Sequence, residues 1–107
     1  MRNATIAQFA AAVADGATVV DVREPHEYVG GHVPGARLVP MSQLPHHTAE
    51  LNRRETVYVI CASGNRSAAM ADLLTRAGFD ARSVDGGTAA WSQSGRPLVV
   101  GTRSNAA

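Results

Sequence analysis

Short apolar runs alternate with amphipathic segments along the chain. The clearest runs are T-V-V-D-V at residues 18–22 and T-V-Y-V-I at residues 56–60. Both are rich in β-branched residues, and neither follows a strict alternation of apolar and polar positions. They therefore predict strands of a parallel sheet that is covered on both faces. Shorter strands are expected at residues 37–40 and 80–84.

The first amphipathic segment, residues 6–15, places apolar side chains on one face at helical spacing. Thr5 and Gln8 form a capping-box pattern before it, and Gly16 follows its end. This combination favours a helix of the folded domain over a secretory signal peptide.

Three further segments complete the secondary-structure prediction. Residues 66–77 have the pattern of a second helix, and the segment around Trp91 is expected to form a short third one. A poor helix is expected from Ser42 onward, since Pro45 is tolerated only in a first helical turn. Residues 23–36 are crowded with Pro and Gly and predict a turn-rich loop.

Strands that alternate with helices predict an α/β fold with a mainly parallel central sheet flanked by helices on both faces. With 107 residues in total, the chain is expected to form a single domain over residues 1–100. Residues 101–107 are small and polar, and we expect this tail to be frayed.

Composition narrows the range of functions. The net charge is +1, and 45% of the residues are hydrophobic. No basic stripe indicates a nucleic-acid partner, and no apolar run approaches the roughly 20 residues of a membrane span. The single cysteine cannot form an intramolecular disulfide, so a cytoplasmic location is expected.

That cysteine, Cys61, stands where an apolar strand stops and the segment A-S-G-N-R-S begins. Ligands of parallel α/β sheets bind at the carboxyl ends of the strands, which is where Cys61 is expected. Small side chains let the following N–H groups turn inward, and the next helix adds the positive end of its dipole. These features predict a reactive thiolate, although a lone cysteine after a strand is also typical of an inert core residue.

Charged side chains near this position have two interpretations. Arg66 lies in the first turn of a helix, where a cation opposes the helix dipole, so it is predicted to bind an anionic substrate. The alternative is an ion pair with Asp21 or Glu24. Asp21 and Arg23 are expected to brace the active-site loop rather than to touch substrate.

The histidines give weaker signals. His32 is expected to hydrogen-bond the loop that contains it, with a role as catalytic base as the alternative. His46 and His47 have no cysteine or acidic partner at metal-ligand spacing, so no metal site is predicted.

Three stretches resemble the signatures of the rhodanese family of sulfurtransferases. They are the loop C-A-S-G-N-R (61–66), the segment D-V-R-E-P-H-E-Y-V-G-G-H-V-P-G-A (21–36) and the segment D-G-G-T-A-A-W (85–91). The resemblance implies that the Cys61 thiolate takes the outer sulfur of thiosulfate, releases sulfite and becomes a persulfide. An acceptor, either cyanide or a thiol that a protein can also supply, then removes that sulfur. Neither a metal nor an organic cofactor is needed. The implied substrate-binding residues are Ala62, Ser63, Gly64, Asn65, Arg66 and Ser67.

Two departures from the family pattern matter. Ala62 and Ser63 stand where larger members that favour thiosulfate carry basic side chains, and Glu27 stands where they carry an arginine. The less cationic entrance puts thiosulfate in doubt as the natural donor. One rival is a phosphatase or arsenate reductase of the same fold, but phosphatases use C-x5-R, and this chain has C-x4-R. The other rival is a non-catalytic protein-binding module.

Overall fold

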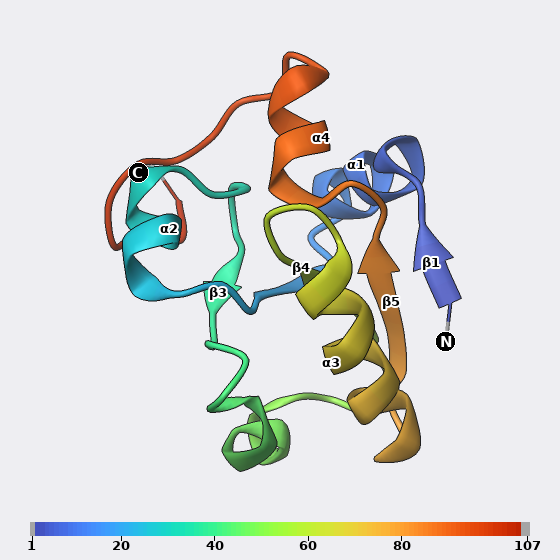
Figure 1. Ribbon diagram of the computed structural model, residues 1–107. Coiled ribbons are helices and arrows are strands. Elements are labelled where there is room, and N and C mark those ends of the chain that lie inside the picture. The colour runs from blue at the N-terminus through green and yellow to red at the C-terminus, as the bar shows by residue number, and fades with distance from the viewer. Residues whose placement is uncertain (1, 106–107) are drawn as a thin grey trace.

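A five-stranded parallel sheet forms the centre of the protein (Figure 1), whose computed structural model describes residues 2–105. The strand order is β1-β5-β4-β2-β3, and each neighbouring pair is parallel. Along the chain the elements are β1 (Arg2–Ala4), α1 (Ile6–Ala14), β2 (Thr18–Asp21), α2 (Pro25–Gly30), β3 (Arg37–Leu38), β4 (Thr56–Ile60), α3 (Asn65–Arg76), β5 (Asp80–Val84) and α4 (Gly87–Gln93).

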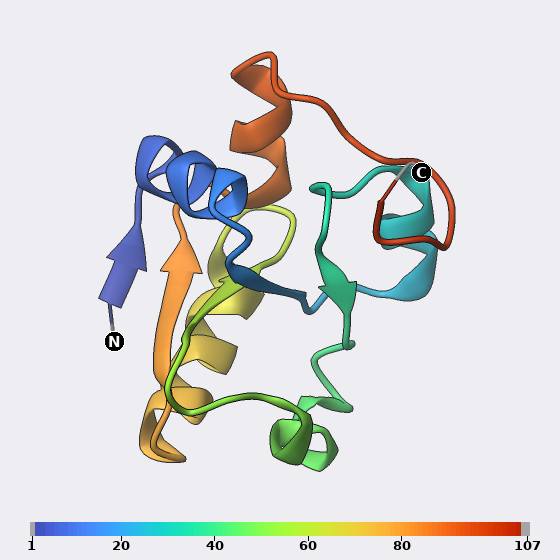
Figure 2. The ribbon, with the colours of Figure 1, turned by 180° about the vertical axis from the view of Figure 1, so that it is seen from behind.

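Helices cover both faces of the sheet, as the alternation of side chains in β4 requires. Val57 and Val59 point to one face and pack with Leu74 of α3. Ile60 points to the other face and belongs to a cluster with Phe9 of α1. Figures 1 and 2, which view the molecule from opposite sides, show α3 and α1 on opposite faces. The predicted α/β fold with a parallel sheet between helical layers is therefore confirmed.

The first helix begins as its sequence predicts. The Thr5 hydroxyl accepts a hydrogen bond from the Gln8 N–H at 3.1 Å, and the Gln8 side chain accepts one from the Thr5 N–H at 3.0 Å. This capping box satisfies two N–H groups that a helix start leaves without partners. Phe9 is completely buried beneath the helix.

The structure differs from the sequence prediction at three places. Residues 23–36 are not entirely loop, because Pro25 starts the helix α2 and Glu27 completes a capping box with the Glu24 N–H. The helix expected from Ser42 onward is replaced by two 3₁₀ turns, at Leu44–His46 and Thr48–Glu50. Strand β1 was not predicted, since three mostly exposed residues give little periodic signal.

The tail also differs from the prediction over residues 101–105. The Gly101 N–H donates to the Val29 carbonyl at 2.9 Å, and the Gly35 N–H donates to the Ser104 carbonyl at 2.8 Å. Figure 2 shows the end of the chain beside α2. The expected fraying of residues 106 and 107 concerns positions outside the described part of the chain.

Candidate active site

Cys61 follows the last residue of β4 directly and lies at the carboxyl edge of the sheet. Only 1% of the residue is exposed. Burial alone would suit an inert core thiol, so the polar groups around the sulfur atom decide between the two interpretations of this cysteine.

Those polar groups converge on Sγ from the loop and the first turn of α3. The Gly64 N–H donates to Sγ at 3.1 Å, and the Ser67 hydroxyl oxygen lies 3.4 Å from Sγ. Burial raises the pKa of the Cys61 thiol, but hydrogen bonds from the Ser67 hydroxyl and from the N–H groups of Ser67, Gly64 and Ser63 lower it further than burial raises it. The net effect is a pKa below the ordinary value of 9.0, so these donors favour the thiolate.

The inward turn of these N–H groups depends on α4, which holds the carbonyls of the loop. The Thr88 N–H and hydroxyl donate to the Cys61 carbonyl at 2.9 and 3.1 Å, and the Ala89 N–H donates to the Ala62 carbonyl at 3.0 Å. A Cβ on Gly87 would lie 2.5 Å from the Cys61 carbonyl oxygen. Glycine therefore allows the helix to approach the loop this closely. Gly64, with φ of 111°, makes the turn into α3.

The hydroxyl of Ser83 lies next to that of Ser67. Ser67 and Ser83, from α3 and β5, are both buried, and their hydroxyl oxygens are 2.8 Å apart. The Ser67 oxygen also lies 3.2 Å from the Gly64 carbonyl, to which its hydroxyl can donate. When Cys61 is a thiolate, Ser83 can donate to Ser67 while Ser67 donates to the sulfur.

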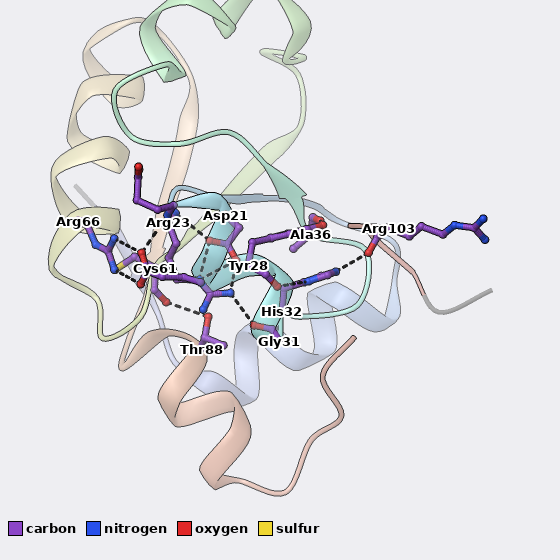
Figure 3. Close-up of polar contacts among 12 residues, drawn as sticks. Asp21, Arg23, Tyr28, Gly31, His32, Ala36, Cys61, Arg66, Thr88 and Arg103 are labelled. Atoms are coloured by element: carbon purple, nitrogen blue, oxygen red, sulfur yellow. Dashed lines mark hydrogen bonds and ion pairs between the residues drawn. The ribbon is translucent and has the colours of Figure 1, made fainter. Parts of the chain in front are cut away.

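Arg66 stands beside Cys61 in Figure 3, and its guanidinium is already engaged. Nη1 and Nη2 donate to the two carboxylate oxygens of Glu27 at 2.8 and 2.9 Å. The hydrogen bond from Arg66, opposed by partial burial, lowers the pKa of Glu27 to about 2. Arg66 thus makes an ion pair, the alternative to the predicted substrate contact, but with Glu27 and not with Asp21 or Glu24. The pair joins the first turns of α2 and α3.

Asp21 and Arg23 form a second pair, which is buried. Arg23 Nε and Nη2 donate to the Asp21 carboxylate at 3.0 and 2.9 Å, and Nη2 also donates to the Gly31 carbonyl at 2.8 Å. Asp21 is completely buried, and Arg23 is 6% exposed. The pair thus braces the end of α2 against β2, and its hydrogen bonds go to Gly31 rather than to the loop after β4.

His32 lies on the side of α2 toward the tail. Its Nδ1 is 2.8 Å from the Tyr28 carbonyl oxygen, and its Nε2 is 2.7 Å from the Arg103 carbonyl oxygen. The ring is completely buried and stacks on Tyr28 with 3.6 Å between the ring centroids. With both nitrogens engaged by the backbone, His32 fastens the tail and is not placed to act as a base for Cys61 (Figure 3).

The remaining loop residues are more open. Ser63 and Asn65 are exposed, and Ala62 lines a hollow of about 480 Å³ between α2 and α4. His26, Glu27 and Thr88 line the same hollow. Among residues 2–105, no group of three His, Cys, Asp or Glu side chains is arranged to hold a metal ion, and no helix has the length and apolar character to cross a membrane.

Comparison with known proteins agrees with this geometry. The model of the family described as "Rhodanese-like domain" matches residues 5–94, which include the carboxyl ends of β2 and β4 and all of α3. The chain belongs to the rhodanese-like domain family. The resemblance seen in the three sequence stretches is thereby confirmed.

Relatives of this rhodanese-like domain include proteins named for sulfur chemistry. The thiosulfate sulfurtransferase GlpE of Pseudoalteromonas translucida is 32% identical over 74 residues, 68% of this chain and 70% of the relative. YqhL of Bacillus subtilis is 38% identical over 76 residues, 70% of this chain. The matches span only 60%, 48% and 33% of the length of YqhL and of two other relatives, slr1261 of Synechocystis and YrkF of Bacillus subtilis.

Solved structures share the whole fold. A rhodanese-related protein from Thermoplasma volcanium superposes with a TM-score of 0.88 at 35% identity, covering 94% of this chain and 99% of that one. A thiosulfate sulfurtransferase from Pseudomonas aeruginosa gives a TM-score of 0.86 at 28% identity, covering 94% of this chain and 20% of that one.

Sequence reasoning alone did not find four contributors to the site. Ser83 is a small residue within a predicted strand, and Gly87 and Thr88 belong to the segment 85–91, which was noted only for its resemblance to the family. Glu27 was noted only as a departure from the family pattern, and its pairing with Arg66 was not anticipated. Pro25 followed closely by an acidic residue is typical of a helix start, and this signal would have predicted α2 and placed Glu27 in its first turn.

Proposed function

We propose that this rhodanese-like domain is a sulfurtransferase that carries sulfur as a persulfide on Cys61. A donor such as thiosulfate supplies the sulfur, and cyanide or a thiol, including a protein thiol, accepts it. The family, the similarity to a protein named thiosulfate sulfurtransferase and the surroundings of Cys61 support this proposal. It includes a cytoplasmic location, because a lone free thiol suits a reducing compartment.

Each step balances without a further reactant. The Cys61 thiolate attacks the outer sulfur of thiosulfate, the S–S bond breaks, and sulfite leaves with the bonding electron pair. The product is a persulfide whose terminal sulfur carries the negative charge. Cyanide or a thiolate then attacks that terminal sulfur, and the Cys61 thiolate leaves. No metal or organic cofactor takes part in either step.

The observation that carries the proposal is the set of donors around Sγ. Gly64 N–H and the Ser67 hydroxyl stabilise negative charge at the end of a strand, in a loop that α4 holds in shape. Fixed dipoles of this kind stabilise a charged intermediate without reorganising during the reaction. An inert core cysteine has no need for such a set of donors.

The two rival functions are less well supported. A phosphatase needs a free cationic side chain and room for a phosphoryl group, but Arg66 is paired with Glu27 and the loop is C-x4-R. The protein from Rhodopseudomonas palustris that is titled a possible tyrosine phosphatase is 24% identical, a likeness that shows the fold alone. A non-catalytic binding module would not require the lowered pKa of Cys61.

Steady-state assays separate these functions. With thiosulfate and cyanide, the wild-type protein should form thiocyanate, and Cys61→Ser should form none. An aryl phosphate should remain intact under the same conditions. Thiocyanate formation that survives in Cys61→Ser would refute the persulfide mechanism, and cysteine-dependent phosphatase activity would favour the rival enzyme.

A further inference from the structure

The arginine side chains near Cys61, Arg66 and Arg23, form hydrogen bonds with partners inside the protein. Both terminal nitrogens of Arg66 donate to Glu27, and Arg23 donates to Asp21 and to the Gly31 carbonyl. The Arg66 side chain is 36% exposed and that of Glu27 is 24% exposed, so the first pair faces the solvent from which a donor must arrive.

The Glu27–Arg66 pair engages both carboxylate oxygens of Glu27. Glu27 accepts three hydrogen bonds, one from the Glu24 N–H at 3.0 Å and two from Arg66. Its carboxyl group therefore remains ionised at all pH values well above about 2. A bidentate arginine–carboxylate contact has fixed geometry as well as charge, so a substrate must compete with Glu27 for the Arg66 guanidinium.

We propose that Glu27 is a specificity-determining residue that disfavours doubly charged sulfur donors by neutralising Arg66. This inference rests on the proposed sulfurtransferase function. The pair leaves no net positive charge beside the cysteine, which attacks as a thiolate. Thiosulfate brings two further negative charges to that position, whereas an organic persulfide with an uncharged tail brings one. The site therefore suits the second class of donor better than the first.

Sulfur transfer from an organic persulfide to Cys61 also balances in atoms, electrons and charge. The Cys61 thiolate attacks the terminal sulfur of the donor persulfide R–S–S⁻, the donor S–S bond breaks, and R–S⁻ leaves with the electron pair. Charge is the same before and after the step. The thiolate that leaves carries one negative charge, whereas the sulfite that leaves thiosulfate carries two.

Glu27→Gln tests the inference directly. The amide oxygen can still accept from the Glu24 N–H, so α2 keeps its first turn while the negative charge is lost. We expect kcat/KM for thiosulfate to rise about 10-fold, the scale of one charge-assisted contact. The value for 2-hydroxyethyl persulfide should change by less than about 3-fold, since that donor depends less on Arg66.

Two further variants give the matched comparison. Glu24→Gln removes an exposed carboxylate from the same helix start without touching the pair, and should leave the ratio of the two donors unaltered. Arg66→Ala leaves the Glu27 carboxylate without its partner, so it should reduce thiosulfate kcat/KM by about 10-fold, and the double variant, which again has no net charge there, should resemble the wild type. A double variant that keeps the full gain of Glu27→Gln, or an unchanged donor ratio in Glu27→Gln, would overturn the inference.

A binding measurement keeps this test separate from turnover. Sulfate, which cannot donate sulfur, should protect Cys61 from iodoacetamide at about 10-fold lower concentration in Glu27→Gln than in the wild type. This shift is expected even if no donor is turned over, a result that would refute the sulfurtransferase proposal alone. Equal protection of the wild type and the variant would refute the role of Glu27.

Discussion

Strands β2 and β4 are neighbours in the sheet, but different kinds of polar group lie at their carboxyl ends. After β4, the neutral Gly64 N–H and Ser67 hydroxyl contact the sulfur of Cys61 and favour its thiolate form. After β2, two full charges, Asp21 and Arg23, are buried and neutralise each other. Dipoles therefore serve the chemistry at one strand end, and paired charges serve the architecture at the other.

This contrast implies that mutations can separate the role of the β2 end in stability from the role of the β4 end in the reactivity of Cys61. Changes at the β2 end should alter the free energy of unfolding and leave the thiolate unaffected while the protein remains folded. Changes at the β4 end should alter the reactivity of Cys61 with a smaller effect on unfolding. The Glu27–Arg66 pair lies between these cases, because it is partly exposed and borders the site.

The largest effect on stability is expected from Asp21→Asn. This change leaves the Arg23 charge buried without its partner, which costs about 3–5 kcal/mol of the free energy of unfolding. Urea titration should show the loss directly. Replacing both Asp21 and Arg23 with apolar residues should recover much of it, since no unpaired charge is then buried. A single variant that loses less than about 1 kcal/mol would show that the pair is not the brace described here.

Ser67→Ala should have the next largest effect, on reactivity. Loss of the hydroxyl removes a hydrogen bond that favours the thiolate, so the pKa of Cys61 should rise. The rate of alkylation by iodoacetamide near neutral pH should fall by about 10-fold, the scale of one hydrogen bond to a charged group. Alkylation rate measured against pH would show both changes.

Ser83→Ala is the matched comparison for that variant, because Ser83 reaches the sulfur only through Ser67. Its alkylation midpoint should move in the same direction by a smaller amount. If Ser67→Ala leaves the midpoint where it is in the wild type, the hydroxyl contributes only to packing.

The smallest effect concerns acid stability and the Glu27–Arg66 pair. The pKa of Glu27 is lowered from 4.5 to about 2, so the stabilisation by the pair is fully present above pH 4.5 and is lost as the pH falls toward 2. A partly exposed pair contributes about 1 kcal/mol or less. Glu27→Gln should therefore be slightly less stable than the wild type at neutral pH, and the two should converge in acid. A gap that widens in acid would contradict the assigned pKa direction.

The sequence predicted the fold well because the fold depends on periodic patterns. The runs at residues 18–22 and 56–60 and the capping box at Thr5 correspond to β2, β4 and the start of α1. Strand β1 and the helix α2 were missed because one is too short and the other is rich in Gly and Pro.

The site was only partly predictable, for a physical reason. Cys61 and the turn at Gly64 follow from local sequence, since a strand end and a small-residue loop are adjacent along the chain. The contacts from Thr88 and Ser83 join segments 27 and 16 residues apart from their partners, and no local pattern encodes such distances. The same holds for Glu27 and Arg66, which are 39 residues apart.

The intact mass of the protein after incubation with a sulfur donor tests the proposed sulfur transfer most directly. We expect the wild type to gain the mass of one sulfur atom with thiosulfate or 2-hydroxyethyl persulfide, and to lose it again when cyanide is added. Cys61→Ser should gain nothing under either condition. A wild-type protein whose mass stays unchanged with both donors, or a Cys61→Ser variant that gains sulfur, would contradict the account.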